Sequence, residues 1–178
     1  MMKSKLIALS AISASFVAVF LTIGAYFRIV DVFAVVIASV FVTLPLYYKS
    51  YKAALLTYLV GGTIAFMISG FNYLSIVFPS YFVFFGIYPI VQNYFLKKKL
   101  NAKILGTVFS LLWFVAYAYG IYFFYTGLIG PLSDIPAWIS KNIYYFIALF
   151  AILFYLVFNR FIFVAEKLIN QILQRIIK

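Results

Sequence analysis

Six long apolar runs dominate this sequence and limit what it can fold into. They extend over residues 6–26, 30–48, 53–69, 73–95, 104–125 and 143–163. A helix needs about 20 apolar residues to cross the hydrocarbon of a bilayer, with a range of about 17–25, so each run is long enough. The strands of a membrane barrel are only about 9–11 residues long and alternate in polarity. The sequence therefore predicts an all-α fold, a polytopic membrane bundle of six transmembrane helices that forms one integral membrane domain over residues 1–178.

The composition excludes several classes of function. Of the 178 residues, 67% are apolar and 10% are charged, whereas soluble domains have about 45–50% apolar and 25% charged residues. A soluble enzyme and a nucleic-acid-binding domain are therefore excluded. The chain has no His and no Cys, and its three acidic residues, Asp31, Asp134 and Glu166, are not expected at membrane depth. We therefore expect a non-enzyme without catalytic residues, metal site or cofactor.

The basic residues predict the orientation in the membrane. Arg28 and Lys141 lie in connections on one predicted side, and the other twelve of the 14 lysines and arginines lie on the opposite side. Because basic residues accumulate in cytoplasmic connections, we expect a cell-membrane protein with both termini in the cytoplasm. The first run is longer than the apolar core of a signal peptide, which is about 7–15 residues, so we expect an uncleaved first helix.

Residues 164–178 show the period of an amphipathic helix. Leu168, Ile169, Ile172, Leu173, Ile176 and Ile177 alternate in pairs with polar residues. This helix either continues the sixth span or lies on the inner leaflet, where its basic residues suit anionic lipids. Membrane lipids are the expected partner, and contact with another protein is the alternative.

Small residues in the first run share one helix face. Ser10, Ala14 and Ala18 are spaced four apart. Small side chains let helices approach closely in lipid. The stripe is therefore either a docking face for a partner subunit or a packing face against another helix of this chain.

Prolines and glycines interrupt three of the runs. Pro45 lies in the second run, Gly61 and Gly62 in the third, and Pro79, Gly86 and Pro89 in the fourth. Proline removes a helical hydrogen bond and kinks a helix. Broken helices can mark a binding site at membrane depth, but transmembrane helices also tolerate such residues without a functional role.

Few polar residues lie on the predicted outer side, and these are the candidate ligand-binding residues. They are Arg28, Asp31, Asn72, Tyr73, Asp134, Trp138, Lys141 and Asn142. Tyr117, Tyr122 and Tyr125 lie toward the same mouth, so a flat heteroaromatic small molecule could stack there. Alternatively, the aromatic residues form an interfacial belt, Arg28 and Asp31 form a local turn pair, and Asp134 caps a short helix.

Three segments resemble a known family. The stretches over residues 44–56 and 61–62 look like the connection from the second to the third helix in the substrate-binding S components of energy-coupling-factor (ECF) vitamin transporters, and residues 14–18 match the AxxxA pattern of their first helix. The resemblance implies a subunit without ATPase activity that captures a small micronutrient from outside. It also implies that the first helix docks on a transmembrane coupling subunit, which works with partner ATPases.

Two other classes remain open. Proteins of the rod-shape-determining membrane protein D family have a similar size and helix number, and they organise cell-wall machinery without transporting anything. This chain could be a scaffold or assembly protein similar to them, or an accessory subunit that uses the amphipathic tail as its contact.

Overall fold

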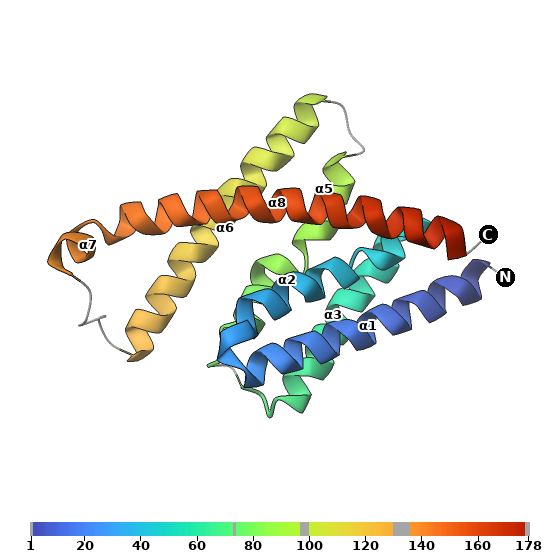
Figure 1. Cartoon of the computed structure of the whole chain (residues 1–178), viewed down its shortest axis with the longest axis horizontal. Coiled ribbons are helices and arrows are strands. Elements are labelled where there is room, and N and C mark those ends of the chain that lie inside the picture. The colour runs from blue at the N-terminus through green and yellow to red at the C-terminus, as the bar shows by residue number, and fades with distance from the viewer. Residues whose placement is uncertain (1, 73, 97–99, 130–135, 177–178) are drawn as a thin grey trace.

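The computed structural model of the chain describes residues 2–72, 74–96, 100–129 and 136–176. Every regular element among them is helical (Figure 1), which confirms the prediction of an all-α fold. The elements are α1 (Met2–Tyr26), η1 (Arg28–Val30), α2 (Asp31–Phe41), η2 (Leu44–Tyr48), α3 (Tyr51–Ile68), α4 (Val77–Ser80), η3 (Tyr81–Phe85), α5 (Tyr88–Leu96), α6 (Leu100–Ile129), α7 (Ala137–Lys141) and α8 (Ile143–Ile176).

Long apolar helices make this a membrane protein. Within the described residues, five helical stretches are long and apolar enough to cross a bilayer: Ser4–Tyr26, Arg28–Tyr48, Tyr51–Ile68, Leu100–Leu128 and Ile143–Arg175. Their outward faces are apolar as well, for example at Ile7, Leu105 and Val157. Large exposed apolar surfaces of this kind need lipid rather than water around them.

The second span is not the single helix over residues 30–48 that the sequence predicts. Helix α2 ends at Phe41, and the 3₁₀-helix η2 follows it. Pro45 explains the change, because it has no N–H to donate to the Phe41 carbonyl and its ring would clash with that carbonyl. Lys49 then takes a left-handed conformation with φ of 57°, and Ser50 caps α3 by accepting a hydrogen bond from the Ala53 N–H at 3.3 Å.

The fourth predicted span, residues 73–95, is also discontinuous. Helix α4 passes into the π-helix η3, where the Gly86 N–H donates to the Tyr81 carbonyl at 2.9 Å, and α5 begins at Tyr88. Pro89 cannot donate to the Phe85 carbonyl, so a regular helix cannot continue through this point. At Gly86 a Cβ atom would lie 2.5 Å from the Tyr58 ring, so only glycine allows this close approach.

This broken segment, α4–η3–α5, forms the centre of the core. Val77, Tyr81 and Phe84 have no exposed surface, and Tyr88 is 1% exposed. Helix α1 packs on α2 and on α3, and all three contact the segment, as does α6. Helix α8 reaches the segment through side chains, with the Phe158 ring on Phe85 and Asn159 hydrogen-bonded to Tyr88. The interruption therefore lies where the two parts of the molecule meet.

Helix α8 is the longest element. It has 34 residues and is about 51 Å long at 1.5 Å per residue. The amphipathic stretch predicted over residues 164–178 continues the sixth span without a break as far as residue 176. In Figure 1 both chain termini lie at the same end of the molecule, and α7 lies at the opposite end.

Candidate functional site

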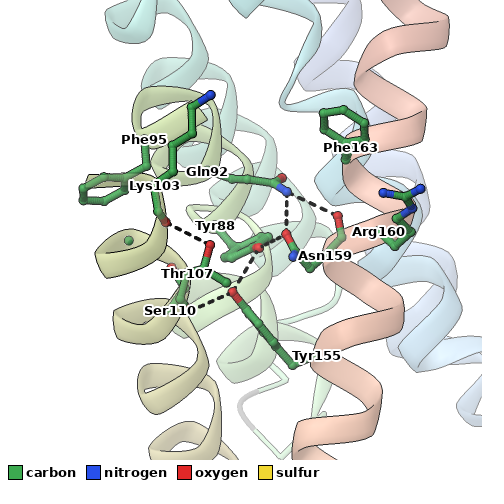
Figure 2. A pocket seen from close by; sticks show the side chains of 11 residues that line it. Tyr88, Gln92, Phe95, Lys103, Thr107, Ser110, Tyr155, Asn159, Arg160 and Phe163 are labelled. Carbon is green, nitrogen blue, oxygen red and sulfur yellow. Dashed lines mark hydrogen bonds between the residues drawn. The ribbon is translucent and has the colours of Figure 1, made fainter. Parts of the chain in front are cut away.

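A polar cavity lies between α5, α6 and α8, and we call it the amide cavity. Its volume is about 250 Å³. Figure 2 shows its lining, which is Tyr88, Gln92, Phe95, Lys103, Gly106, Thr107, Ser110, Tyr155, Asn159, Arg160 and Phe163. Polar side chains are costly in the apolar part of a membrane protein and tend to mark functional sites there. The amide cavity is therefore the main candidate site.

Asn159 is the central acceptor of this cavity. Its Oδ1 accepts one hydrogen bond from the Tyr88 hydroxyl and one from Gln92 Nε2, both at 2.6 Å (Figure 2). The Tyr155 hydroxyl oxygen lies 3.4 Å from that of Tyr88 and donates to the Thr107 carbonyl at 3.1 Å. Hydrogen bonds between neutral groups thus join α5, α6 and α8. They give the polar atoms partners that lipid cannot provide.

The network leaves some polar groups available to a ligand. Gln92 Oε1 is buried and has no hydrogen-bond partner. Lys103 and Arg160 also line the cavity, and in Figure 2 their charged groups lie on either side of the Gln92 amide. None of the described residues that line the cavity is acidic. The lining therefore offers one unused acceptor and two basic side chains.

A second polar cluster lies next to the cavity, where α3, α5 and α8 meet. Asn93 is 4% exposed, and its Nδ2 donates to Glu166 Oε1. The Tyr51 hydroxyl donates to Asn93 Oδ1 at 3.1 Å. Asn93 of α5 thus links α3 to α8, and Glu166 is not part of the described lining of the amide cavity.

A smaller cavity of about 180 Å³ lies at the other end of the broken segment, and we call it the Asp31 cavity. It is lined by Asp31, Val32, Val35, Ile76, Ser80, Phe85, Phe114, Tyr117 and Phe154. The Tyr117 hydroxyl donates to Ser80 Oγ. Asp31 Oδ1 accepts from the Val32 N–H at 2.6 Å in the first turn of α2, where a carboxylate is favourable. Most of the lining is apolar, so only a small and largely apolar molecule fits.

Aromatic rings separate the two cavities. The Phe84 ring centroid lies 5.0 Å from that of Tyr88, on the amide-cavity side, and 4.6 Å from that of Phe114, on the Asp31 side. Phe85 packs on Phe158 at 4.9 Å. Since Phe84 and Phe85 belong to η3, the π-helix itself carries the barrier between the cavities.

The predicted outer-face residues that the structure describes do not line one cavity. Of this set, Asp31 is the residue that lines a described cavity. Arg28 and Asn72 are exposed in the first two connections. Tyr73 and Asp134 lie outside the described residues.

The remaining three residues of the set lie in or next to α7. Trp138, Lys141 and Asn142 are exposed, and the Asn142 side-chain amide donates to the Trp138 carbonyl at 3.0 Å. Figure 1 places α7 far from the α1–α2 turn that carries Arg28 and Asp31. The prediction grouped these residues because all lie in connections on the same predicted side of the membrane. Connections on one side of a bundle need not meet.

The small-residue stripe of α1 faces the inside of this chain. Ala14 is 8% exposed and Ala18 is 5% exposed. A Cβ atom at Gly61 of α3 would lie 3.0 Å from the Ala14 carbonyl oxygen. The Ser10 carbonyl accepts from the Thr57 hydroxyl at 3.4 Å. The structure therefore gives Ser10, Ala14 and Ala18 the alternative role, which is close packing against α3, rather than an open docking face.

The amide cavity was not predicted from the sequence, although a signal was present. Gln92, Asn93 and Asn159 are the three Asn and Gln residues within the six predicted spans. A search for neutral amides at membrane depth, instead of charged residues in connections, would have found them. Their convergence depends on the rotation of α5 against α8, which apolar periodicity does not specify.

Comparisons of the chain with protein-family models, curated proteins and solved structures found no match.

Proposed function

We propose that this protein is a six-span, non-enzymatic substrate-binding subunit of an ECF-type importer in the cell membrane. It captures a small, vitamin-like micronutrient at the outer face in the Asp31 cavity. It then works with a transmembrane coupling subunit and partner ATPases. Both chain termini are cytoplasmic in this proposal.

The observation that carries the proposal is the broken segment with a cavity on either side of its aromatic barrier. Discontinuous helices line the binding sites of many transporters, because their interruption exposes polar groups at membrane depth. Here η3 presents Phe85 to the Asp31 cavity, and the following helix presents Tyr88 to the amide cavity. This arrangement suits a protein that admits a molecule from one side and changes shape afterwards.

The proposed topology has support from the arrangement of the chain ends. The termini lie at one end of the molecule (Figure 1), as an even number of spans requires. The broken segment would supply the sixth crossing. It extends from Val77 to Leu96, which is 20 positions and close to the length that crosses the hydrocarbon.

The coupling surface would be the outward face of α1. Ala11 and Ser15 are exposed beside the buried stripe, together with Phe16 and Val19. Small side chains on this face leave room for a helix of a partner to approach. We propose this face in place of Ser10, Ala14 and Ala18, whose positions are occupied by contacts within the chain.

Affinity purification tests the proposal. The tagged protein, extracted in mild detergent from its native cells, should bring down a coupling subunit and ATPases and retain a small molecule visible by native mass spectrometry. Substituting both Tyr117→Phe and Ser80→Ala should reduce the retained ligand, because the polar contacts of the Asp31 cavity are lost. Tyr122→Phe is the matched control, because Tyr122 lies on the same helix and outside the described lining. Purification with cell-wall proteins and no ATPase would instead favour the scaffold.

Labelling from outside the cell tests the topology. Because the chain has no cysteine, Lys141→Cys and Lys52→Cys each provide a single thiol. An impermeant maleimide should label position 141 in intact cells, and it should label position 52 only after permeabilisation. The reverse pattern would invert the proposed orientation.

A further inference from the structure

We infer that the amide cavity binds the phosphate ester of a polyol, held by its phosphate between Lys103 and Arg160 and by a hydroxyl at Gln92. This site is separate from the capture of a micronutrient in the Asp31 cavity. Neither proposal depends on the other.

The charge of the cavity favours an anion. Lys103 comes from α6 and Arg160 from α8, so the two positive charges approach the cavity from different helices. Glu166 is the nearest acidic residue to Arg160 along α8, and it accepts from Asn93 and is not part of the described lining. Arginine and lysine together are a common combination for phosphate, which arginine can bind through two parallel N–H groups.

The hydrogen-bonding pattern favours a ligand that also has a hydroxyl group. Gln92 Nε2 is used by Asn159, and Gln92 Oε1 is left as a buried acceptor without a partner. A buried acceptor without a donor is unfavourable, so a ligand hydroxyl that donates to it would be stabilising. Inorganic phosphate has no separate hydroxyl group that could donate to Gln92 Oε1 while the phosphate binds the two basic side chains.

The size and surroundings of the cavity limit the ligand further. A volume of about 250 Å³ is below the range of about 300–1,000 Å³ that is typical of sites for drug-sized molecules. Phe95 and Phe163 flank the polar groups, and the Arg160 guanidinium carbon lies 5.9 Å from the Phe163 ring centroid. A small head group fits the polar part, and an attached acyl chain could follow the apolar rim. The same chemistry could thus come from a phospholipid such as phosphatidylglycerol or from a free polyol phosphate.

Binding measurements on the delipidated, detergent-purified full chain test the inference and distinguish the two sources. The probes are phosphatidylglycerol, sn-glycerol 3-phosphate, and methyl phosphate as a comparison that lacks the hydroxyl groups. Native mass spectrometry counts the bound molecules and gives relative affinities. One bound phosphatidylglycerol without binding of glycerol phosphate identifies the lipid, and one bound glycerol phosphate identifies the soluble ester. Either result supports the site.

Two double variants of equal charge test where the anion binds. Lys103→Gln with Arg160→Gln should weaken binding by about tenfold or more, because two charge-assisted hydrogen bonds are lost. Lys167→Gln with Arg175→Gln removes the same charge from outside the cavity lining and should leave the affinity unchanged. Since Arg160 is exposed, its replacement should not prevent folding. Lys103→Arg with Arg160→Lys keeps the charges and should retain most of the binding.

Three results would overturn the inference. The first is no binding of either ester by the wild-type chain. The second is an equal loss of affinity in both double variants, which would indicate general attraction to a basic protein. The third is measurable binding of methyl phosphate with the same affinity as glycerol phosphate, which would remove the role of the hydroxyl at Gln92.

Discussion

The helices of the first half of the molecule, α1 to α3, are held together by a different kind of contact from those of the second half, α5 to α8. Helices α1 and α3 meet through small residues, and the Gly61 backbone lies close to the Ala14 carbonyl. Helices α5 and α8 meet through rings and through the hydrogen bonds at Asn159. The first kind of interface depends on shape and leaves no room for rearrangement. The second depends on bonds that can be exchanged and leaves cavities along the broken segment. We therefore expect ligands to bind along that segment and rigidity to come from the contact between α1 and α3.

The strongest test of this difference fills the small-residue interface. Ala14→Leu with Ala18→Leu places large side chains where α1 meets its neighbours, and we expect the free energy of unfolding to fall by about 4 kcal/mol. Unfolding in mixed detergent, followed by circular dichroism, measures it. Ala11→Leu with Ser15→Leu on the outward face of α1 should leave the stability nearly unchanged. Equal losses in both double variants would mean that the two faces of α1 are packed alike.

A single methyl group should give a smaller version of the same effect. In Gly61→Ala the new Cβ would lie 2.6 Å from Val17 Cγ1, so we expect a loss of about 2 kcal/mol. Gly120→Ala is the matched control, because nothing lies within 4 Å of a Cβ at that helical position. The melting temperature should therefore fall for Gly61→Ala, and it should rise or stay unchanged for Gly120→Ala.

The polar interface should be less sensitive than the small-residue interface. Asn159→Leu removes the acceptor of the Tyr88 hydroxyl and one of the two acceptors of Gln92 Nε2, which keeps the backbone carbonyl of residue 159 at 3.2 Å. We expect a loss of about 1.5 kcal/mol. A double-mutant cycle with Tyr88→Phe measures the coupling between the two side chains. If their effects are simply additive, the hydrogen bond at 2.6 Å contributes nothing to the interface.

The smallest effect is expected at the Asp31 cavity. Tyr117→Phe removes the hydrogen bond to Ser80 and should lower the free energy of unfolding by about 0.6 kcal/mol. The same variant should affect ligand retention more than stability, if the cavity binds the micronutrient. A large loss of stability with no change in retention would assign this pair to packing alone.

The spans were largely predictable because lipid requires long apolar segments, and their interruptions follow from individual residues. Pro45 and Pro89 lie next to the points where the second and fourth spans depart from a regular helix. The site was not predictable in the same way. Tyr88 and Asn159 are 71 residues apart, and they meet only because α5 and α8 present the right faces to each other. No local pattern records that orientation, since both helices are apolar around most of their surface.

The length of α8 has a mechanical consequence. This unbroken helix carries Phe150 beside an apolar groove shared with α6, Asn159 in the amide cavity, and Arg175 near the chain terminus. At about 51 Å it exceeds the hydrocarbon thickness of about 30 Å, so it is tilted or projects beyond the bilayer. Because Asn159 lies near the middle of this stiff rod, a small pivot at its hydrogen bonds would move both ends of α8 through larger arcs in opposite directions.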